Sequence, residues 1–266
     1  MSSQPCKFAN RYTSISKLGE GTYGTVWLTQ DLRDDSLHAA KVVPDVQCHR
    51  KSWCELRGAW IPDEILLSET LDHPNIVRLE EIFFEENKWI LVMEFLPGFV
   101  ELFEYTAQTG HMSVKHARNV TKQLVDAVNY LATLGIDHRD IKDENILYNP
   151  TTKQMKLIDF GSASLIPETP YTKLQGTDVY IPPEYFRHGV YSSLPATSWA
   201  VGCLVYVLLN GDCPFDTTQE VKEYKKLKFR NKWLDKRSRE FIRDLLTEDE
   251  NERILPGEIM LHPWMK

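Results

Sequence analysis

The residues best suited to chemistry lie in one run, HRDIKDEN at positions 138–145, with a further carboxylate at Asp159. Together they hold carboxylates, an amide and cations, which is the equipment that phosphoryl transfer needs. Asp140 could orient a hydroxyl nucleophile and accept its proton, and Lys142 could neutralise the moving phosphate. Asn145 and Asp159 offer the oxygen ligands that Mg²⁺ prefers. A polar loop without chemistry would explain any one of these residues but not the whole string.

A second candidate site is the glycine-rich segment LGEGTYGTV near the start of the chain. Its members are Leu18, Gly19, Glu20, Gly21, Thr22, Tyr23, Gly24, Thr25 and Val26. Glycines lack Cβ, so their backbone amides can approach phosphate oxygens closely. Dinucleotide-binding folds use similar spacing, but there a helix follows the glycines. Here the chain continues as a strand, so we predict a hairpin over the phosphates of a nucleotide.

A lysine in an apolar strand, Lys41, could hold the phosphates of that nucleotide, although many strand lysines are simply exposed. It needs an acidic partner to fix its position. We choose Glu64, because residues 62–67 read as the start of a helix with acids near its positive end. Glu55 and Glu69 lie nearby, so Glu64 could also serve only the helix dipole.

The remaining patterns predict an α+β fold with two lobes. Strand-like runs from Tyr12 onward predict a small antiparallel sheet with one main helix, over residues 12–95. The larger lobe, residues 96–266, reads as mainly helical, and residues 1–11 read as a short extension. Its longest periodic helix starts at Ser113, a plausible N-cap, and its most apolar run spans residues 199–209.

Composition narrows the class of protein. The chain has 266 residues, 42% hydrophobic and 26% charged, which is typical of globular proteins. A net charge of −7 argues against nucleic acid as the main partner. Five cysteines without a CxxC pair favour free thiols in a reducing compartment. No signal-peptide core or bilayer-length apolar run is evident, so we expect no membrane association and a location in the cytoplasm or nucleus. We also expect the protein to be a monomer.

The motifs HRDIKDENIL, KLIDFGSAS and GTDVYIPPE resemble those of the eukaryotic protein kinases, and the resemblance covers residues 12–264. Among them the chain looks most like the Pim serine/threonine kinases, with the PAS-domain kinases next. This resemblance implies the bilobal kinase fold, ATP and Mg²⁺ as cofactors, and protein substrates. It also implies further adenine-pocket residues, which are Ala39, Met93, Glu94, Leu96 and Leu147.

The resemblance assigns roles to other residues as well. Thr177 is expected to contact the catalytic aspartate, and Glu184 should pair with Arg253 to brace the larger lobe. Acids at the positions where Pim kinases bind basic peptides suggest a substrate with arginine or lysine upstream of the acceptor; they are Glu101, Glu104, Asp143, Glu144 and Asp212. A solvated acidic surface is the alternative, since acids outnumber bases throughout.

Several positions depart from the family pattern. Leu96 replaces a hinge proline of the Pim kinases, so an adenine-facing amide returns. Lys173 replaces an acid that pairs with Arg139, which could then use Glu168 or a phosphate on Thr169 or Thr172. A small side chain stands at a spine position, a carboxylate precedes the HRD motif, and a hydroxyl replaces the aspartate that supports the catalytic loop; these are Ser68, Asp137 and Thr197. They leave open a pseudokinase scaffold without turnover.

Overall fold

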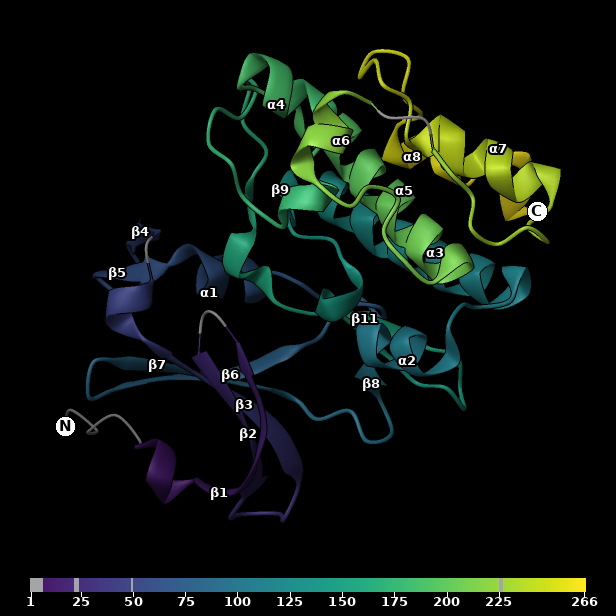
Figure 1. The fold of residues 1–266 in the computed structure, drawn as a ribbon. Helices are drawn as coiled ribbons and strands as arrows, with labels where there is room; N and C mark the ends of the chain where they lie inside the picture. Colours follow the sequence, from purple (N-terminus) through teal and green to yellow (C-terminus); the bar gives the residue numbers. More distant parts are fainter. Residues whose placement is uncertain (1–6, 22–23, 49, 225–226) are drawn as a thin grey trace. The chain divides into compact units, whose positions relative to one another are not determined.

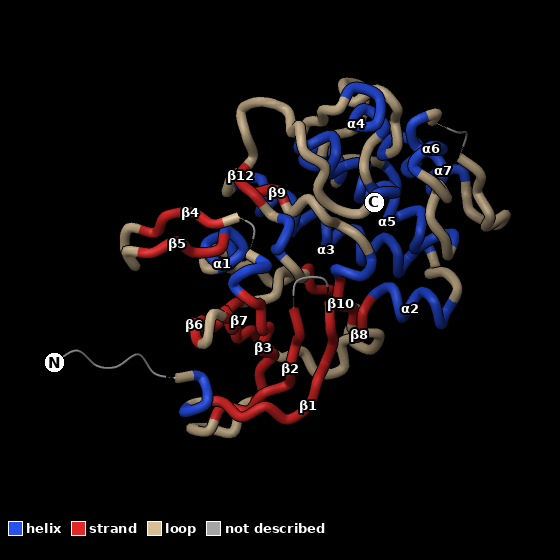
Figure 2. Tube along the Cα trace, turned by 60° about the vertical axis from the view of Figure 1, so that its left-hand side comes forward, coloured by secondary structure: helices blue, strands red, loops and turns tan. Residues whose placement is uncertain are grey.

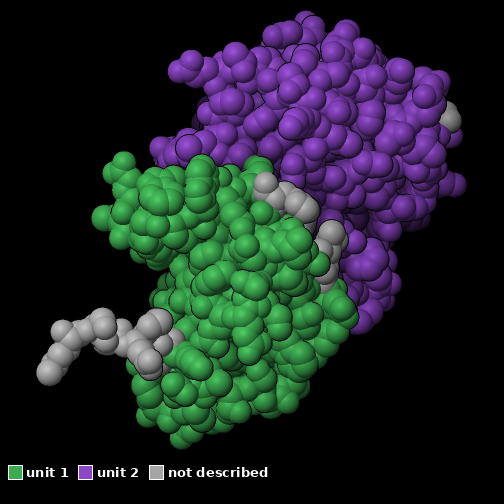
Figure 3. Space-filling model, turned by 90° about the vertical axis from the view of Figure 1, so that its left-hand side faces the viewer, with its two compact units in different colours: residues 1–73, 77–97 green, residues 74–76, 98–266 purple. Residues whose placement is uncertain are grey.

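The computed structural model describes residues 7–21, 24–48, 50–224 and 227–266, and the chain divides into two compact units (Figure 3). Unit 1 comprises Met1–His73 and Val77–Pro97, and unit 2 comprises Pro74–Ile76 and Gly98–Lys266. The division falls after residue 97, whereas the sequence analysis placed it after residue 95. Each unit has its own core.

Unit 1 is built on a five-stranded antiparallel sheet in the order β1-β2-β3-β7-β6 (Figures 1 and 2). The strands are β1 Tyr12–Gly21, β2 Gly24–Asp31, β3 Leu37–Pro44, β6 Leu79–Glu85 and β7 Lys88–Glu94. The predicted small antiparallel sheet is therefore confirmed.

The two faces of this sheet carry different apolar clusters, because side chains alternate along each strand. Ala40 and Val92 belong to one cluster together with Tyr12. Val43 and Leu91 belong to the other, which includes Ile61 and Ile65. Lys41 lies two residues from Val43 on the same strand, so the alternation turns Lys41 toward the face that carries Ile65 and its helix.

That helix is α1, Asp63–Ser68, and it follows a hairpin of β4 Lys51–Cys54 and β5 Ala59–Pro62. Residues 62–67 were predicted to start a helix, but the sequence analysis did not predict the hairpin. Trp53 and Trp60 face each other across it with ring centroids 6.0 Å apart. Both rings are exposed, so the hairpin contributes to the core through Ile61 rather than through its tryptophans.

Unit 2 is mainly helical, with short strands beside the helices (Figure 1). Its α-helices are α2 Leu102–Thr109, α3 Val114–Thr133, α4 Pro183–His188, α5 Ser193–Asn210, α6 Thr218–Lys222, α7 Lys236–Leu245 and α8 Pro256–Ile259. β11 Met155–Leu157, β10 Ile146–Tyr148 and β8 Val100–Glu101 form one small sheet, and β9 Ile136–Asp137 pairs with β12 Ser164–Leu165. The predicted helical lobe is confirmed.

The core of unit 2 forms around α3 and α5. Ser113 caps α3, and its hydroxyl accepts a hydrogen bond from the amide of His116 at 3.4 Å. The periodic apolar residues of α3 are buried, as their spacing predicted. α5 starts at Ser193, six residues before the predicted apolar run. By length and apolar composition α5 could cross a membrane, but most of it is buried inside the protein, so this is weak evidence for a span.

Candidate active site

The loop between α3 and β10 gathers the predicted catalytic residues around Asp140. The hydroxyl of Thr177 donates to Asp140 Oδ1 at 3.0 Å, and the Lys142 ammonium donates to Thr177 Oγ1 at 2.9 Å. Lys142 Nζ also lies 3.5 Å from Asp140 Oδ2. The carboxylate is 14% exposed, so it is held firmly yet open to a reactant. Carboxylate, ammonium and hydroxyl thus form one connected network.

Asn145 completes this network and leaves an oxygen for a metal ion. Its amide nitrogen donates to the main-chain carbonyl of Asp140 at 2.8 Å and to Asp140 Oδ2 at 2.9 Å. Because the nitrogen is engaged in this way, the amide oxygen is the atom that Asn145 offers as a ligand. The main-chain carbonyl of Asn145 accepts from Ile158 N at 3.0 Å, which joins this loop to the residue before Asp159.

Asp159 adopts a left-handed backbone conformation, with φ +61°, and its Oδ1 accepts a hydrogen bond from Gly161 N at 3.2 Å. Asn145 and Asp159 supply the hard oxygen donors that fit Mg²⁺. No cluster of three or more His, Cys, Asp or Glu side chains suited to a metal occurs among the described residues. Mg²⁺ needs no such cluster, since phosphate oxygens and water complete its coordination.

A buried histidine links the loop to the segment after Asp159. His138 is paired with the main-chain carbonyl of Ile158 at 3.0 Å, and its ring packs edge-on against Phe160 with centroids 4.9 Å apart. Burial lowers the pKa of His138, so the neutral imidazole is favoured. His138 therefore acts as a rigid spacer between the two segments.

Arg139 has partners other than the acid that the sequence analysis considered. Its guanidinium donates to the Tyr191 hydroxyl at 2.8 Å and to the main-chain carbonyl of Lys173 at 3.2 Å. It also lies over the ring of Tyr171, 4.0 Å from the centroid. Glu168 is not among these partners, so that option was wrong. The sequence offered no local signal for the two tyrosines, which lie 32 and 52 residues from Arg139 along the chain.

Asp137 is buried, with 6% of its surface exposed, and the structure supplies the partners that the sequence could not name. Ser193 donates to Oδ2 at 2.6 Å, Thr197 donates to Oδ1 at 3.3 Å, and the Arg139 amide donates to Oδ1 at 3.2 Å. Burial nevertheless raises the pKa of Asp137. Two positions that depart separately from the family pattern, 137 and 197, are in direct contact.

Gly176 brings the end of the preceding segment against the catalytic loop. Its φ is +98°, and a Cβ added there would lie 2.4 Å from the main-chain oxygen of Arg139 and 3.5 Å from Asp140 Oδ1. Only glycine fits at this distance without moving the backbone. The position of Thr177 beside Asp140 therefore depends on the residue before it.

In unit 1 the structure pairs Lys41 with Glu64, at 2.5 Å between Nζ and Oε1. Both side chains are largely buried, 10% and 15% exposed, so the ion pair is shielded from solvent. Glu55 and Glu69 are not part of this pair, and Glu69 instead contacts Arg57. The choice of Glu64 agrees with this geometry.

The glycine-rich segment spans the ends of β1 and β2, where Gly21 pairs with Gly24. A Cβ on Gly24 would lie 2.2 Å from the main-chain oxygen of Val42, so β2 approaches β3 more closely than a side chain would allow. Leu18, Gly19 and Glu20 lie in β1, and Thr25 and Val26 lie in β2. The predicted contacts of Thr22 and Tyr23 lie outside the described residues.

The predicted adenine-pocket residues are placed on defined elements. Ala39 of β3 is directly opposite Met93 of β7. Glu94 ends β7, and its amide donates to the main-chain oxygen of Arg78 at 3.1 Å. Leu96 follows in unit 1, and Leu147 lies in β10 of unit 2.

The five predicted substrate-binding acids differ in their surroundings. Glu101 has a raised pKa because of partial burial and the nearby carboxylates of Glu104, Glu144 and Asp143. Asp143 is buried and accepts a hydrogen bond from Tyr180 at 3.1 Å, and Glu144 lies 2.9 Å from Lys142 Nζ. Asp212 forms a salt bridge with Arg230. Four of these acids thus lie near one another, and two of the five, Glu144 and Asp212, are paired with a cation.

Glu184 and Arg253 form a bidentate salt bridge, with N–O distances of 2.8 and 2.9 Å. Arg253 is fully shielded and its guanidinium also lies 5.0 Å from the ring centroid of Trp199. It further donates to the main-chain carbonyls of Pro195 and Thr247. This pair therefore ties the start of α4 to α5 and to the loop after α7.

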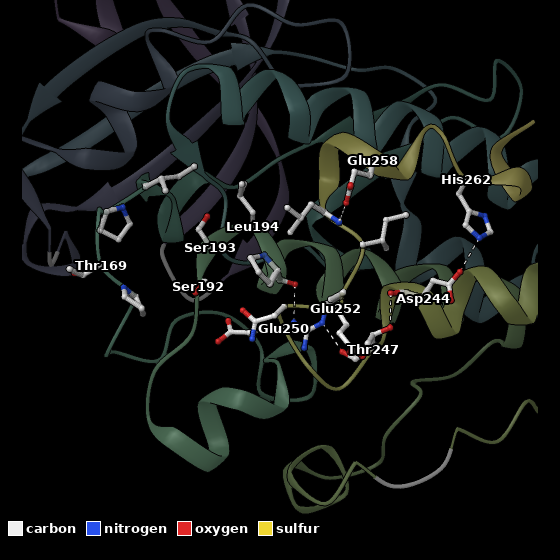
Figure 4. A pocket seen from close by; sticks show the side chains of 18 of the residues that line it. Thr169, Ser192, Ser193, Leu194, Asp244, Thr247, Glu250, Glu252, Glu258 and His262 are labelled. Carbon is white, nitrogen blue, oxygen red and sulfur yellow. Dashed lines mark hydrogen bonds and ion pairs between the residues drawn. The ribbon is translucent and has the colours of Figure 1, made fainter.

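A groove of about 1040 Å³ in unit 2 lies outside the network around Asp140, although Arg253 is among its lining residues. Its lining also includes Thr169, Ser192, Leu194, Glu250 and Glu258 (Figure 4). It contains none of the residues predicted to contact ATP, metal or substrate. Volume alone therefore does not identify the candidate active site, which is defined by the network around Asp140.

Comparison with known proteins agrees with this geometry. Residues 12–265 match the protein kinase domain family. The chain belongs to the protein kinase family. This confirms the predicted resemblance and kinase fold, and it supports the predicted enzyme class, an ATP-dependent protein kinase.

Three kinases illustrate the similarity. The chain is 32% identical to serine/threonine-protein kinase pim-2 of Danio rerio over 97% of this chain and 86% of that protein. It is 30% identical to serine/threonine-protein kinase prk-2 of Caenorhabditis elegans, over 98% and 59%. It is 34% identical to CBL-interacting protein kinase 16 of Oryza sativa subsp. japonica, over 96% and 57%. This kinase chain thus spans little more than half of the latter two proteins.

Proposed function

We propose that this chain transfers the γ-phosphate of ATP to serine or threonine hydroxyls of protein substrates. The observation that carries the proposal is the network in which Asp140 is held by Thr177, Lys142 and Asn145. A carboxylate fixed in this way can orient a hydroxyl without reorganising during the reaction, which is how electrostatic preorganisation lowers a barrier.

Each member of the network has a distinct role. Asp140 accepts a hydrogen bond from the substrate hydroxyl and takes its proton as the new bond to phosphorus forms. Lys142, already 3.5 Å from the carboxylate, places positive charge where the transferred phosphoryl group gains negative charge. Thr177 keeps Asp140 and Lys142 in register through one hydroxyl.

Each unit contains residues suited to bind part of the nucleotide. Lys41, fixed by Glu64, would bind the α- and β-phosphates, and the main-chain amide of Leu96 would donate to adenine. Asn145 and Asp159 would bind Mg²⁺, which when bound neutralises charge on the phosphate oxygens. The serine/threonine class of the acceptor is supported by the names of two of the relatives, pim-2 and prk-2.

We propose further that the preferred substrates carry basic residues upstream of the acceptor. Glu101 and Glu104 support this, because partial burial and the neighbouring carboxylate of Glu104 raise the pKa of Glu101. Mutual repulsion among carboxylates is relieved when a cation binds between them. Asp212 and Glu144 contribute less, since each is already paired with a cation of this chain.

The decisive experiment compares wild type with Asp140→Asn, using Mg·ATP, a basic serine peptide and mass spectrometry. We expect phosphate incorporation by the wild type and a loss of roughly 10³-fold or more in the variant, since it lacks the base and one oxygen of the network. Asp126→Asn makes the same chemical change on the exposed side of α3 and should leave activity unchanged.

Equal activity of wild type and Asp140→Asn would refute the assignment of the base. Binding of Mg·ATP by the wild type without any phosphate transfer would instead favour the nucleotide-binding scaffold. Mass spectrometry of the protein itself after the same incubation would also report any phosphate added to Thr169 or Thr172.

A further inference from the structure

The side chain of Asp137 joins the catalytic loop to α5. Its two oxygens accept hydrogen bonds from Ser193, Thr197 and the Arg139 amide, at 2.6, 3.3 and 3.2 Å. Ser193 and Thr197 are four residues apart, so both hydroxyls lie on one face of the first turns of α5. The helix presents its positive end there, which favours a carboxylate.

This arrangement is costly unless every contact is made. A buried carboxylate without hydrogen-bond donors is strongly disfavoured, and the pKa of Asp137 is raised by burial even with these donors present. Asp137 is therefore tolerated because three donors converge on it. That convergence needs residues separated by 56 and 60 positions in the chain.

The contact with the Arg139 amide lies beside a strained turn. Arg139 has φ +65°, a left-handed conformation that residues other than glycine rarely adopt. Such a conformation persists only where its surroundings impose it. Asp137 Oδ1 accepts a hydrogen bond from the Arg139 amide. The Tyr191 hydroxyl and the Lys173 carbonyl accept hydrogen bonds from the Arg139 guanidinium. The next residue is Asp140.

We propose that Asp137 is a positioning residue for phosphoryl transfer, which fixes the turn at Arg139 from α5 and thereby aims the Asp140 carboxylate. Asp137 itself contacts no reacting atom. The proposal rests on the proposed function, because it gives Asp140 the role of base. This role of Asp137 also explains how Thr197 can replace the aspartate that usually supports the catalytic loop. The supporting carboxylate comes from Asp137, beside the loop, and not from α5.

The geometry allows a relocation test. Thr197 Oγ1 and the Arg139 amide contact the same oxygen, Asp137 Oδ1. A carboxylate introduced by Thr197→Asp could therefore reach that amide from α5 once the side chain of Asp137 is removed. A cavity of about 30 Å³ is lined by Asp137 and Thr197 and leaves room for the additional atom.

The experiment measures kcat and the KM for ATP in wild type, Asp137→Ala, Thr197→Asp and the double variant. Asp137→Ala should lower kcat by roughly 10²-fold with little change in the KM for ATP, because only the base is misdirected. Thr197→Asp alone should also lower kcat, since two carboxylates then share one buried site. The double variant should recover at least about tenfold over Asp137→Ala.

Asp137→Asn keeps the shape of the side chain but leaves one acceptor oxygen, and it covers the case in which Asp137→Ala does not fold. It should lower kcat by a smaller factor than Asp137→Ala, again with little effect on the KM for ATP. Unchanged kcat in Asp137→Asn, or a double variant no better than Asp137→Ala, would overturn the proposal.

A readout without turnover separates this inference from the proposed function. Amide hydrogen exchange of residues 137–141 should become faster in Asp137→Ala, or in Asp137→Asn, and return toward the wild-type rate when Thr197→Asp is added to Asp137→Ala. If the wild type transfers no phosphate but exchange follows this pattern, the proposed function is wrong, while the role of Asp137 in fixing the turn at Arg139 is supported. Exchange rates that do not change with the residue at position 137 would refute that role.

Discussion

Thr177 shows how much of the site depends on a single hydroxyl. It donates to Asp140 and accepts from Lys142, at 3.0 and 2.9 Å, so it keeps a carboxylate and an ammonium at fixed positions. Thr177 and the residues next to it are far along the chain from the catalytic loop. A change at this residue should therefore affect chemistry more than nucleotide binding.

Thr177→Val should lower kcat by roughly 10- to 100-fold, because valine keeps the shape but removes both hydrogen bonds. The KM for ATP should change little. Thr177→Ser retains the hydroxyl and serves as the control, with kcat close to wild type. A fall in nucleotide affinity rather than in kcat would contradict this role.

At the scale of elements, the Glu184–Arg253 pair is the clearest brace. It is buried, bidentate and joins α4 to the loop after α7. The net contribution of such a pair is small because desolvation offsets the attraction, but removing one partner leaves an uncompensated charge.

Arg253→Met should therefore lower the free energy of unfolding by about 3–5 kcal/mol. The double variant with Glu184→Leu should lose less than the single variant, since no charge is then left buried. Denaturant titration of both variants measures this difference. A double variant less stable than Arg253→Met would show that the hydrogen bonds matter more than the lone charge.

The stability of the protein should depend on pH through Asp31, at the end of β2. The Asp31 carboxylate accepts hydrogen bonds from Arg33 at 3.0 and 2.7 Å and from Arg11 at 3.2 Å. The bonds from Arg33 hold the pKa of Asp31 well below its ordinary value, despite its burial. A lowered pKa in the folded state stabilises the fold above the ordinary pKa, and this stabilisation is lost as pH falls.

Asp31→Asn should therefore lower the melting temperature at pH 7, and the gap to wild type should narrow as pH falls below about 4. Asp35→Asn, an exposed position in the same turn, is the control and should show a small gap at every pH. A gap for Asp31→Asn that does not change with pH would mean that its charge contributes nothing.

The sequence predicted these elements unevenly, for physical reasons. α3 was predicted well because a capping serine and an apolar stripe are local signals. The β4–β5 hairpin was missed, although Gly58, with φ +59°, marks its turn, because its tryptophans stay exposed and give no core pattern. Ser193 as a partner of Asp137 could not be predicted, since 56 residues separate them and no period relates them.

At the scale of the whole molecule, the net charge of −7 bears on substrate choice. An acidic protein attracts a basic peptide over distances up to about 8 Å at physiological salt, and salt screens the attraction. The general charge alone would act on any cation. The cluster around Glu101 should act only on a peptide whose basic residues lie near the acceptor.

The KM for a peptide with arginines upstream of serine should therefore rise several-fold between about 50 and 300 mM salt. Glu101→Gln with Glu104→Gln should reduce this salt dependence. Glu223→Gln, exposed on the loop after α6, removes charge elsewhere and is the control. Equal effects of the cluster and the control variants would indicate a diffuse acidic surface without a specific subsite.

The close approach of Gly176 to the Arg139 carbonyl has a consequence for how this protein can vary. A saturation library at position 176 should show the narrow tolerance expected of a residue that takes part in the reaction, although glycine has no side chain to contribute. Mutational scans that equate intolerance with chemistry would misassign it. The segment that contains Gly176 and the loop that contains Arg139 can change in sequence during evolution only if both change together.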